Sequence, residues 1–78
     1  MTIEEFIERF AFAIEADPDA FDADTNFKAL ENWDSLNALS LIAMADADYG
    51  VALGGQDILT SSTIRDLYEI VKSRIAQP

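Results

Sequence analysis

One serine stands where a covalent attachment could form. Asp34-Ser35-Leu36 follows Trp33, at the junction between a long aspartate-rich segment and an apolar helical stretch. A hydroxyl at the start of a helix is exposed, and a phosphodiester on it would lie in the positive field of the helix dipole. Alternatively, an oxygen of Asp34 or Ser35 could simply cap the helix by accepting its first free amides. The pattern therefore indicates either a phosphate attachment site or an ordinary N-cap.

Composition excludes most catalytic chemistry. The 78 residues contain no cysteine and no histidine, and the only lysines are Lys28 and Lys72. Ser-His and Cys-His pairs, thiolate ligands and zinc or haem sites therefore cannot form within the chain. We expect that the protein is not an enzyme.

The segment before the serine carries part of a calcium motif. Asp22, Asp24 and Asn26 match the first three ligand positions of a calcium-binding loop. The sixth position requires glycine and is Phe27, and the twelfth requires a bidentate glutamate and is Trp33. We interpret the segment as a solvated acidic loop and expect no metal site.

The charge balance restricts the partners. Five basic residues face fifteen acidic ones, which gives a net charge of −10. Such a chain repels nucleic acids and anionic membranes and favours partners with basic patches. The acidic N-terminus and the apolar runs of at most five residues fit neither a signal peptide nor a membrane span. The expected location is the cytoplasm.

Helical periodicity predicts a first helix and a loop after it. The helix starts near Thr2, where Thr2 and Glu5 form a capping box, and ends before Asp17-Pro18. Its apolar stripe contains Ile3, Phe6, Ile7, Phe10 and Ile14. The loop runs to Asp34, and we expect some of Phe21, Phe27 and Leu30 to pin it onto the core.

A second helix is predicted over residues 35–49. It has few helix breakers, and Gly50 is placed to end it in a left-handed conformation. Leu41 and Ile42 broaden its apolar arc, so it is either buried on more than one side or presents apolar surface to a partner. The expected stripe contains Leu36, Leu39, Ala43, Met44 and Ala47.

A short helical turn is expected near residues 56–59, and a last helix begins after residues 60–63. Thr63 and Asp66 form a plausible capping pair for that helix. Its stripe contains Ile64, Leu67, Tyr68, Val71 and Ile75. The pattern predicts one all-α domain over residues 1–78, a four-helix bundle of three longer helices and one short one.

This spacing resembles that of acyl carrier proteins, which attach 4′-phosphopantetheine to the serine of an Asp-Ser-Leu motif at the start of their second helix. Phe27 lies eight residues before Ser35, and Gly50 follows an aromatic residue at the helix end. Thr63-Ile64 is similar to the Thr-Val that opens the last helix of the family. The likeness covers nearly the whole chain, with no gap between Ser35 and Ile64.

The resemblance implies a carrier without catalysis of its own, expected to be a monomer. A phosphopantetheinyl transferase of the holo-ACP synthase type would move the arm from coenzyme A to Ser35. Asp34 would present the serine, and Leu36 completes the cofactor-binding motif. The arm's thiol would hold an acyl group as a thioester for acyl-loading and acyl-transferring enzymes.

The resemblance also implies that the acyl chain can fold back between the helices. Taken singly, each candidate for such a cleft could equally be ordinary core. These candidates are Leu39, Ile42, Ala43, Met44, Leu59, Ile64 and Tyr68.

Departures from the family pattern suggest a specialised pathway. Asn32 stands where the family has glycine, and Asn37 and Ser40 stand where it often has acids. Ten of the fifteen acidic residues lie in residues 1–34, which carry −8, while the remainder carries −2. Steering of partners should therefore act less through the front of the second helix, where we expect a few dedicated enzymes to contact an uncharged face.

Two alternatives stay open. An aminoacyl carrier of the D-alanyl or peptidyl type would use the same serine, although the glycines that usually precede the serine of peptidyl carriers are missing here. A bundle that only binds a protein partner would use Ser35 as a cap and carry nothing.

Overall fold

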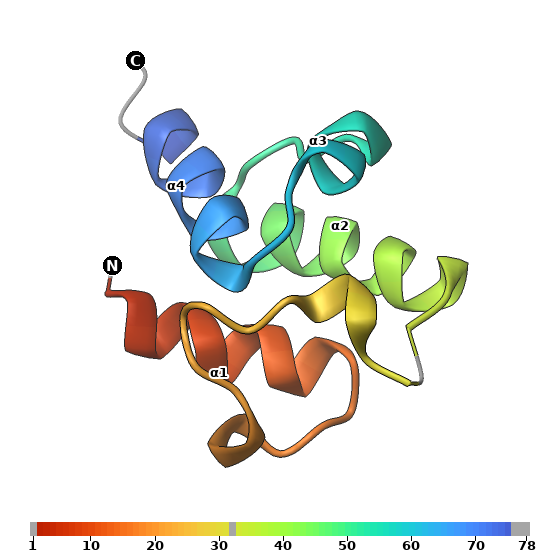
Figure 1. The fold of residues 1–78 in the computed structure, drawn as a ribbon. Helices are drawn as coiled ribbons and strands as arrows, with labels where there is room; N and C mark the ends of the chain where they lie inside the picture. The colour runs from red at the N-terminus through yellow and green to blue at the C-terminus, as the bar shows by residue number, and fades with distance from the viewer. Residues whose placement is uncertain (1, 32, 76–78) are drawn as a thin grey trace.

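The computed structural model describes residues 2–31 and 33–75. In this part of the chain, four α-helices and two short 3₁₀ turns are formed (Figure 1). The helices are α1 (Ile3–Ala13), α2 (Ser35–Tyr49), α3 (Gly55–Thr60) and α4 (Ile64–Ile75). The 3₁₀ turns, Pro18–Ala20 and Phe27–Ala29, lie in the long segment between α1 and α2. The predicted all-α four-helix bundle, with its short third helix and long first loop, is confirmed.

The helix ends follow from local side-chain chemistry. The Thr2 hydroxyl accepts a hydrogen bond from the Glu5 amide at 3.2 Å, which fixes the start of α1. At α4 the pairing is reciprocal: the Thr63 hydroxyl accepts from the Asp66 amide at 3.2 Å, and the Asp66 carboxylate accepts from the Thr63 amide at 3.0 Å. Gly50 ends α2 at φ 65°, the left-handed conformation that favours glycine.

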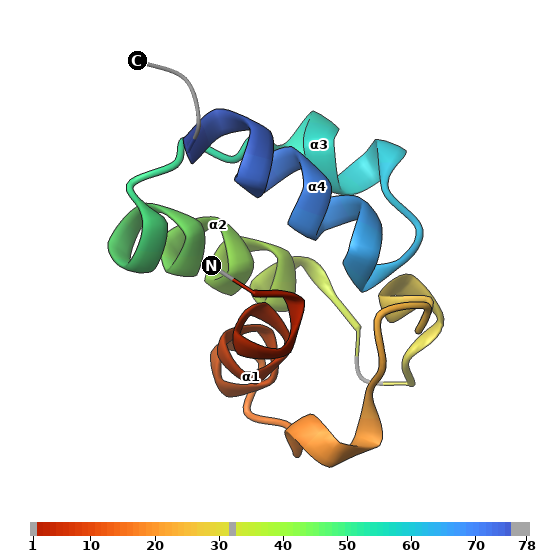
Figure 2. The ribbon, with the colours of Figure 1, turned by 90° about the vertical axis from the view of Figure 1, so that its left-hand side faces the viewer.

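Helix α2 packs against each of the other three helices. Figure 2 shows α3 and α4 on one side of α2 and α1 on the other. The core between them is built from aromatic and branched aliphatic side chains, and its largest fully buried members include Phe6, Phe10, Phe27, Leu41, Ile64, Leu67 and Val71. None of the described helices is both long and apolar enough to cross a membrane.

Of the stripe predicted for α2, only Met44 is buried, and the rest of the stripe presents apolar surface to solvent. The helix buries Leu41, Met44 and Ala45. Leu36 is 69% exposed, Leu39 is 62% exposed, and Ala43 and Ala47 are exposed as well. Because α2 is apolar around most of its circumference, its own periodicity cannot select the buried face, and contacts with α1 and α4 select it instead.

The long loop is pinned to the core by aromatic side chains, as predicted. Phe27 is fully buried, and its ring meets the Phe10 ring edge-on at a centroid distance of 5.6 Å. The Phe21 ring meets the same Phe10 ring edge-on at a centroid distance of 5.9 Å, and Leu30, partly buried, packs against the core. The loop is also tied to the start of α4, because the Arg65 amide donates to the Ala23 carbonyl at 2.8 Å. The described residues of the loop are therefore packed and hydrogen-bonded parts of the fold.

Candidate functional site

The Asp-Ser-Leu motif lies at the first turn of α2. Asp34 has extended backbone angles (φ −153°, ψ −177°), and its carboxylate accepts a hydrogen bond from the Asn37 amide at 2.9 Å. Asp34 is therefore the N-cap, and Ser35 is the exposed first residue of the helix. Capping does not explain Ser35, because its neighbour performs that role.

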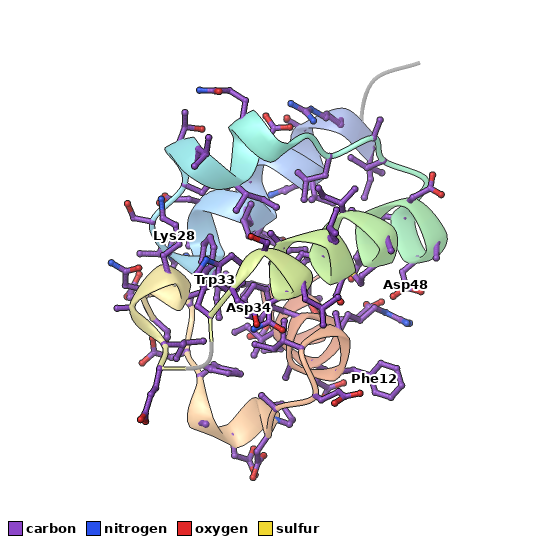
Figure 3. The ribbon with its side chains drawn as sticks, turned by 90° about the vertical axis from the view of Figure 1, so that its right-hand side faces the viewer. Phe12, Lys28, Trp33, Asp34 and Asp48 are labelled. Atoms are coloured by element: carbon purple, nitrogen blue, oxygen red, sulfur yellow. The ribbon has the colours of Figure 1, made fainter. Side chains whose placement is uncertain are left out.

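Aromatic packing fixes the residue before the motif. The Trp33 ring lies edge-on to the buried Phe27 ring at a centroid distance of 5.0 Å. Lys28, one residue after Phe27, donates from its Nζ to the Leu59 carbonyl at 2.8 Å and so joins the loop to α3. Figure 3 shows Lys28, Trp33 and Asp34 close together at the start of α2. The residues near Ser35 are thus anchored at two points. Trp33 packs against the core through Phe27, and Lys28 is hydrogen-bonded to α3.

An apolar groove of about 610 Å³ opens beside Ser35 between α2, α3 and the loop. Lys28 and Asp34 supply the charged groups among its lining side chains. The lining residues are Lys28, Trp33, Asp34, Ser35, Ala38, Leu39, Ile42, Gly55, Ile58 and Leu59. The exposed hydroxyl of Ser35 is therefore continuous with a surface that suits an extended apolar chain.

The structure brings three of the seven predicted cleft residues to this groove, namely Leu39, Ile42 and Leu59. The other four do not line it. Met44, Ile64 and Tyr68 are buried in the core, where the Tyr68 ring meets the Phe6 ring edge-on at 5.8 Å, and Ala43 is exposed on another face of α2.

The sequence prediction missed Lys28, Trp33, Ala38, Gly55 and Ile58. Part of this lining carries a signal, because Ser35, Ala38, Leu39 and Ile42 follow the i, i+3, i+4, i+7 spacing of one helical face. A stripe that starts at Ser35 includes Ala38, Leu39 and Ile42. Asn32, which replaces the usual glycine, lies outside the described residues.

An ion pair holds the α3 wall of the groove against α4. Arg74 donates from Nη1 and Nη2 to the two carboxylate oxygens of Asp57, each at 2.8 Å. Nη1 also donates to the Ala52 carbonyl at 2.7 Å. The Arg74 guanidinium, followed by the Gly54 amide, holds the pKa of Asp57 below its usual value of 3.8. The bidentate pair therefore fixes α3 while Asp57 is ionised.

The carboxylates of the partial calcium motif have partners within the protein. Asp22 accepts from the Asp24 amide at 2.8 Å, and Asp24 pairs with Arg65 at 3.3 Å. Among the described residues, no group of three potential metal ligands is gathered in one place.

The arrangement at Ser35 fits a phosphopantetheine group. The hydroxyl is accessible, and the first amides of α2, which have no partner within the helix, favour a phosphodiester at this position. The groove offers room for a chain that extends from the serine. The residues that would hold the group are Ser35, the first turn of α2 and the lining of the groove.

Comparison with known proteins agrees with this fit. A family model described as phosphopantetheine attachment site matches residues 4–71. Members of that family carry covalently attached 4′-phosphopantetheine and act as carriers, not as catalysts, which confirms the predicted cofactor and the non-enzymatic role. No curated protein matches the chain. The match spans most of the sequence, so the chain belongs to the phosphopantetheine attachment site family and is a phosphopantetheine carrier protein.

Proposed function

We propose that Ser35 carries the 4′-phosphopantetheine arm and that the protein is an acyl carrier dedicated to one specialised biosynthetic pathway. The observation that carries this proposal is the apolar groove of about 610 Å³ that opens beside Ser35. When bound, the arm supplies a terminal thiol that holds the cargo as a thioester. Ser35 contributes the oxygen of the phosphodiester, and Asp34 keeps the first turn of α2 in place by capping it.

The lining of the groove favours an acyl cargo over an aminoacyl one. Leu39, Ile42 and Leu59 offer apolar surface, and each methylene group that leaves water for such a surface gains about 0.8 kcal/mol. The ammonium group of an alanyl cargo would lose hydration there without a comparable gain. An acyl chain therefore has a physical reason to fold back, whereas an alanyl group does not.

The uncharged front of α2 supports a narrow set of partners. A carrier of this family interacts with a phosphopantetheinyl transferase and with enzymes that handle the cargo. Residues 35–45 contain no charged side chain, and Leu36 and Leu39 are largely exposed there. Enzymes that meet this face gain from apolar contact, so their affinity should depend little on salt. A monomeric state and a cytoplasmic location are part of the same proposal.

Intact-mass measurement tests the attachment serine. The purified protein is incubated with coenzyme A and a broad-specificity phosphopantetheinyl transferase, beside Ser35→Ala and Ser40→Ala. Ser40 is the matched control, because it lies on the same helix and its hydroxyl bonds the Leu36 carbonyl at 3.0 Å. We expect a gain of one phosphopantetheine in the wild type and in Ser40→Ala, and none in Ser35→Ala. A gain in folded Ser35→Ala would contradict the proposal.

Thermal stability of the loaded forms tests the cargo. An octanoyl group on the arm should raise the free energy of unfolding by about 1–3 kcal/mol over the unacylated form, because part of the chain is buried. An alanyl group should change it little. Leu39→Asn, in the groove lining, should remove the gain, and Leu36→Asn, equally exposed but outside the lining, should keep it. Stabilisation by the alanyl group alone would favour the aminoacyl alternative.

A further inference from the structure

Phe12 is an aromatic side chain that the fold leaves in water. It lies near the end of α1 and is 86% exposed, more than any other large apolar side chain of the described residues. Figure 3 shows the ring pointing away from α1 into open space. The buried face of the same helix holds Phe6 and Phe10. A single exposed aromatic residue is ordinary, so its meaning depends on what surrounds it.

Carboxylates line a hollow beside Phe12. Phe12 borders a hollow of about 280 Å³ together with Glu5, Glu8 and Arg9 of α1 and Asp48 of α2. Three carboxylates thus face one guanidinium. Arg9 reaches both helices, with Nε 3.7 Å from Glu5 Oε1 and Nη1 3.6 Å from Asp48 Oδ2. These long, exposed contacts neutralise part of the charge and leave the hollow negative.

The neighbouring tyrosine responds to the same field. Burial raises the pKa of the Tyr49 hydroxyl, and the carboxylates of Glu5 and Asp48 raise it further, against the opposing effect of Arg9. Because three carboxylates and one guanidinium line the hollow, a positive group that enters it is attracted.

The charge decides between possible occupants. A second copy of the chain brings its own net charge of −10 and the same ring of carboxylates, so self-association through this surface is repulsive. Anionic membranes and nucleic acids are repelled for the same reason. A guanidinium group can interact with both the aromatic ring and the carboxylates of the hollow. It stacks on an aromatic face, and its planar set of N–H donors matches the two oxygens of a carboxylate.

We propose that Phe12 and the hollow beside it form a docking site for an arginine side chain on the surface of a partner protein. Asp48 follows Ser35 by 13 residues, which is about 20 Å along α2. A partner held at this end leaves Ser35 and the groove free for chemistry. The docking site does not depend on the arm, so it goes beyond the proposed carrier function.

A titration followed by NMR tests the site. The ¹⁵N-labelled protein is titrated with an alanine-rich helical peptide that carries two arginines one turn apart, and with the same peptide in which citrulline replaces arginine. We expect the amide shifts to gather in residues 5–13 and at Asp48, and the citrulline peptide to bind at least about fivefold more weakly. Ser35→Ala should bind the arginine peptide as the wild type does, so failure of the attachment proposal is separate from failure here.

Variants of the hollow sharpen the test. Phe12→Ser should weaken peptide binding about fivefold, because it removes the stacking face from an exposed position. Glu8→Gln should weaken it about threefold. Glu69→Gln is the matched control, since it removes one exposed carboxylate from α4 and should leave the affinity unchanged.

Five results would overturn the proposal. Equal weakening by Glu8→Gln and Glu69→Gln would mean that net charge alone attracts the peptide. An unchanged affinity of Phe12→Ser, or shifts that gather in residues 36–42, would remove the hollow from the interaction. Dimerisation in sedimentation that Phe12→Ser abolishes would make a second copy the occupant, and Phe12-dependent binding to phosphatidylcholine vesicles would make it a lipid surface.

Discussion

Exposed apolar side chains lie near both ends of α2, in different electrostatic settings. At its start, Leu36 and Leu39 lie on a front without charges, beside an apolar groove that opens at Ser35. Near its end, Asp48 lines a hollow together with carboxylates of α1 and the exposed Phe12. Exposure alone would not distinguish the two surfaces. Their surroundings do, because one suits a hydrocarbon chain and the other suits a positive side chain.

The two ends are also held by different forces. The start of α2 is fixed by the Asp34 cap and by the Trp33 ring against the buried Phe27 ring. The end of α2 is joined to α1 partly through Arg9, whose ion pairs are long and exposed. Salt should therefore change interactions at the end of α2 far more than those at Ser35.

Phe27→Ala and Phe12→Ala give the largest contrast between the two regions. Phe27→Ala should lower the free energy of unfolding by about 3–5 kcal/mol, because it leaves a cavity under the loop that carries the motif. Phe12→Ala should change it by less than about 0.5 kcal/mol, since its ring lies in water. Urea denaturation measures both. Comparable losses in the two variants would show that Phe12 is part of the core and would remove the contrast.

Asp34 variants separate capping from presentation at the serine end. Asp34→Ala should cost about 1 kcal/mol of unfolding free energy because the Asn37 amide loses its acceptor. Asp34→Asn should retain nearly all of the stability, since asparagine caps equally well. If the carboxylate also presents Ser35, both variants should load more slowly with the transferase. Normal loading of Asp34→Asn would limit the role of Asp34 to capping.

Asp57→Asn tests the α3 wall of the groove through its pH dependence. At neutral pH it should cost about 1 kcal/mol, because the pair with Arg74 is partly open to water. The pKa of Asp57 is lowered in the fold, so this stability is present above the usual value of 3.8 and is lost as the pH falls through the lowered folded value. The difference between wild type and variant in urea denaturation should therefore shrink below about pH 4.

Asp46→Asn is the control for that experiment. It removes an exposed carboxylate near the other end of α2 and should change the unfolding free energy by less than about 0.5 kcal/mol at neutral pH. A difference between Asp57→Asn and wild type that stays constant down to about pH 2 would contradict the role of the ion pair.

Glu15→Gly, just after the end of α1, should give the smallest change in the free energy of unfolding. Glu15 has φ 57°, a left-handed conformation in which glycine carries no strain. Glycine there should raise the melting temperature slightly, by a gain of about 0.5 kcal/mol after its greater freedom in the unfolded chain is subtracted. Glu8→Gly, inside α1, should cost about 1 kcal/mol instead. Destabilisation by both would mean that Glu15 makes a contact worth more than its strain.

The sequence alone was sufficient to predict the four helices and the position of the Asp-Ser-Leu motif at the start of α2. Gly50 ends α2 where it was predicted to, and the Thr63 and Asp66 capping pair opens α4. These features depend on residues a few positions apart, so local chemistry decides them. The position of Ser35 in the first turn of α2 was predicted for the same reason, because the Asp-Ser-Leu motif lies at a helix start.

The cleft was harder to predict because it depends on how helices meet. Met44, Ile64 and Tyr68 have the apolar character of lining residues, but they are buried in the core. Trp33 and Lys28 reach the groove from a segment without regular periodicity, through the packing of Phe27 and a bond to Leu59. The exposure of Phe12 also went unnoticed, although it lies off the apolar stripe of α1.

Tandem mass spectrometry of the loaded wild-type protein tests the central claim most directly. After reaction with coenzyme A and a phosphopantetheinyl transferase, the peptide that spans the start of α2 is fragmented to locate the added mass. The account predicts phosphopantetheine on Ser35 and on no other hydroxyl. Its location on Ser40, or on the serines and threonines between α3 and α4, would contradict the account.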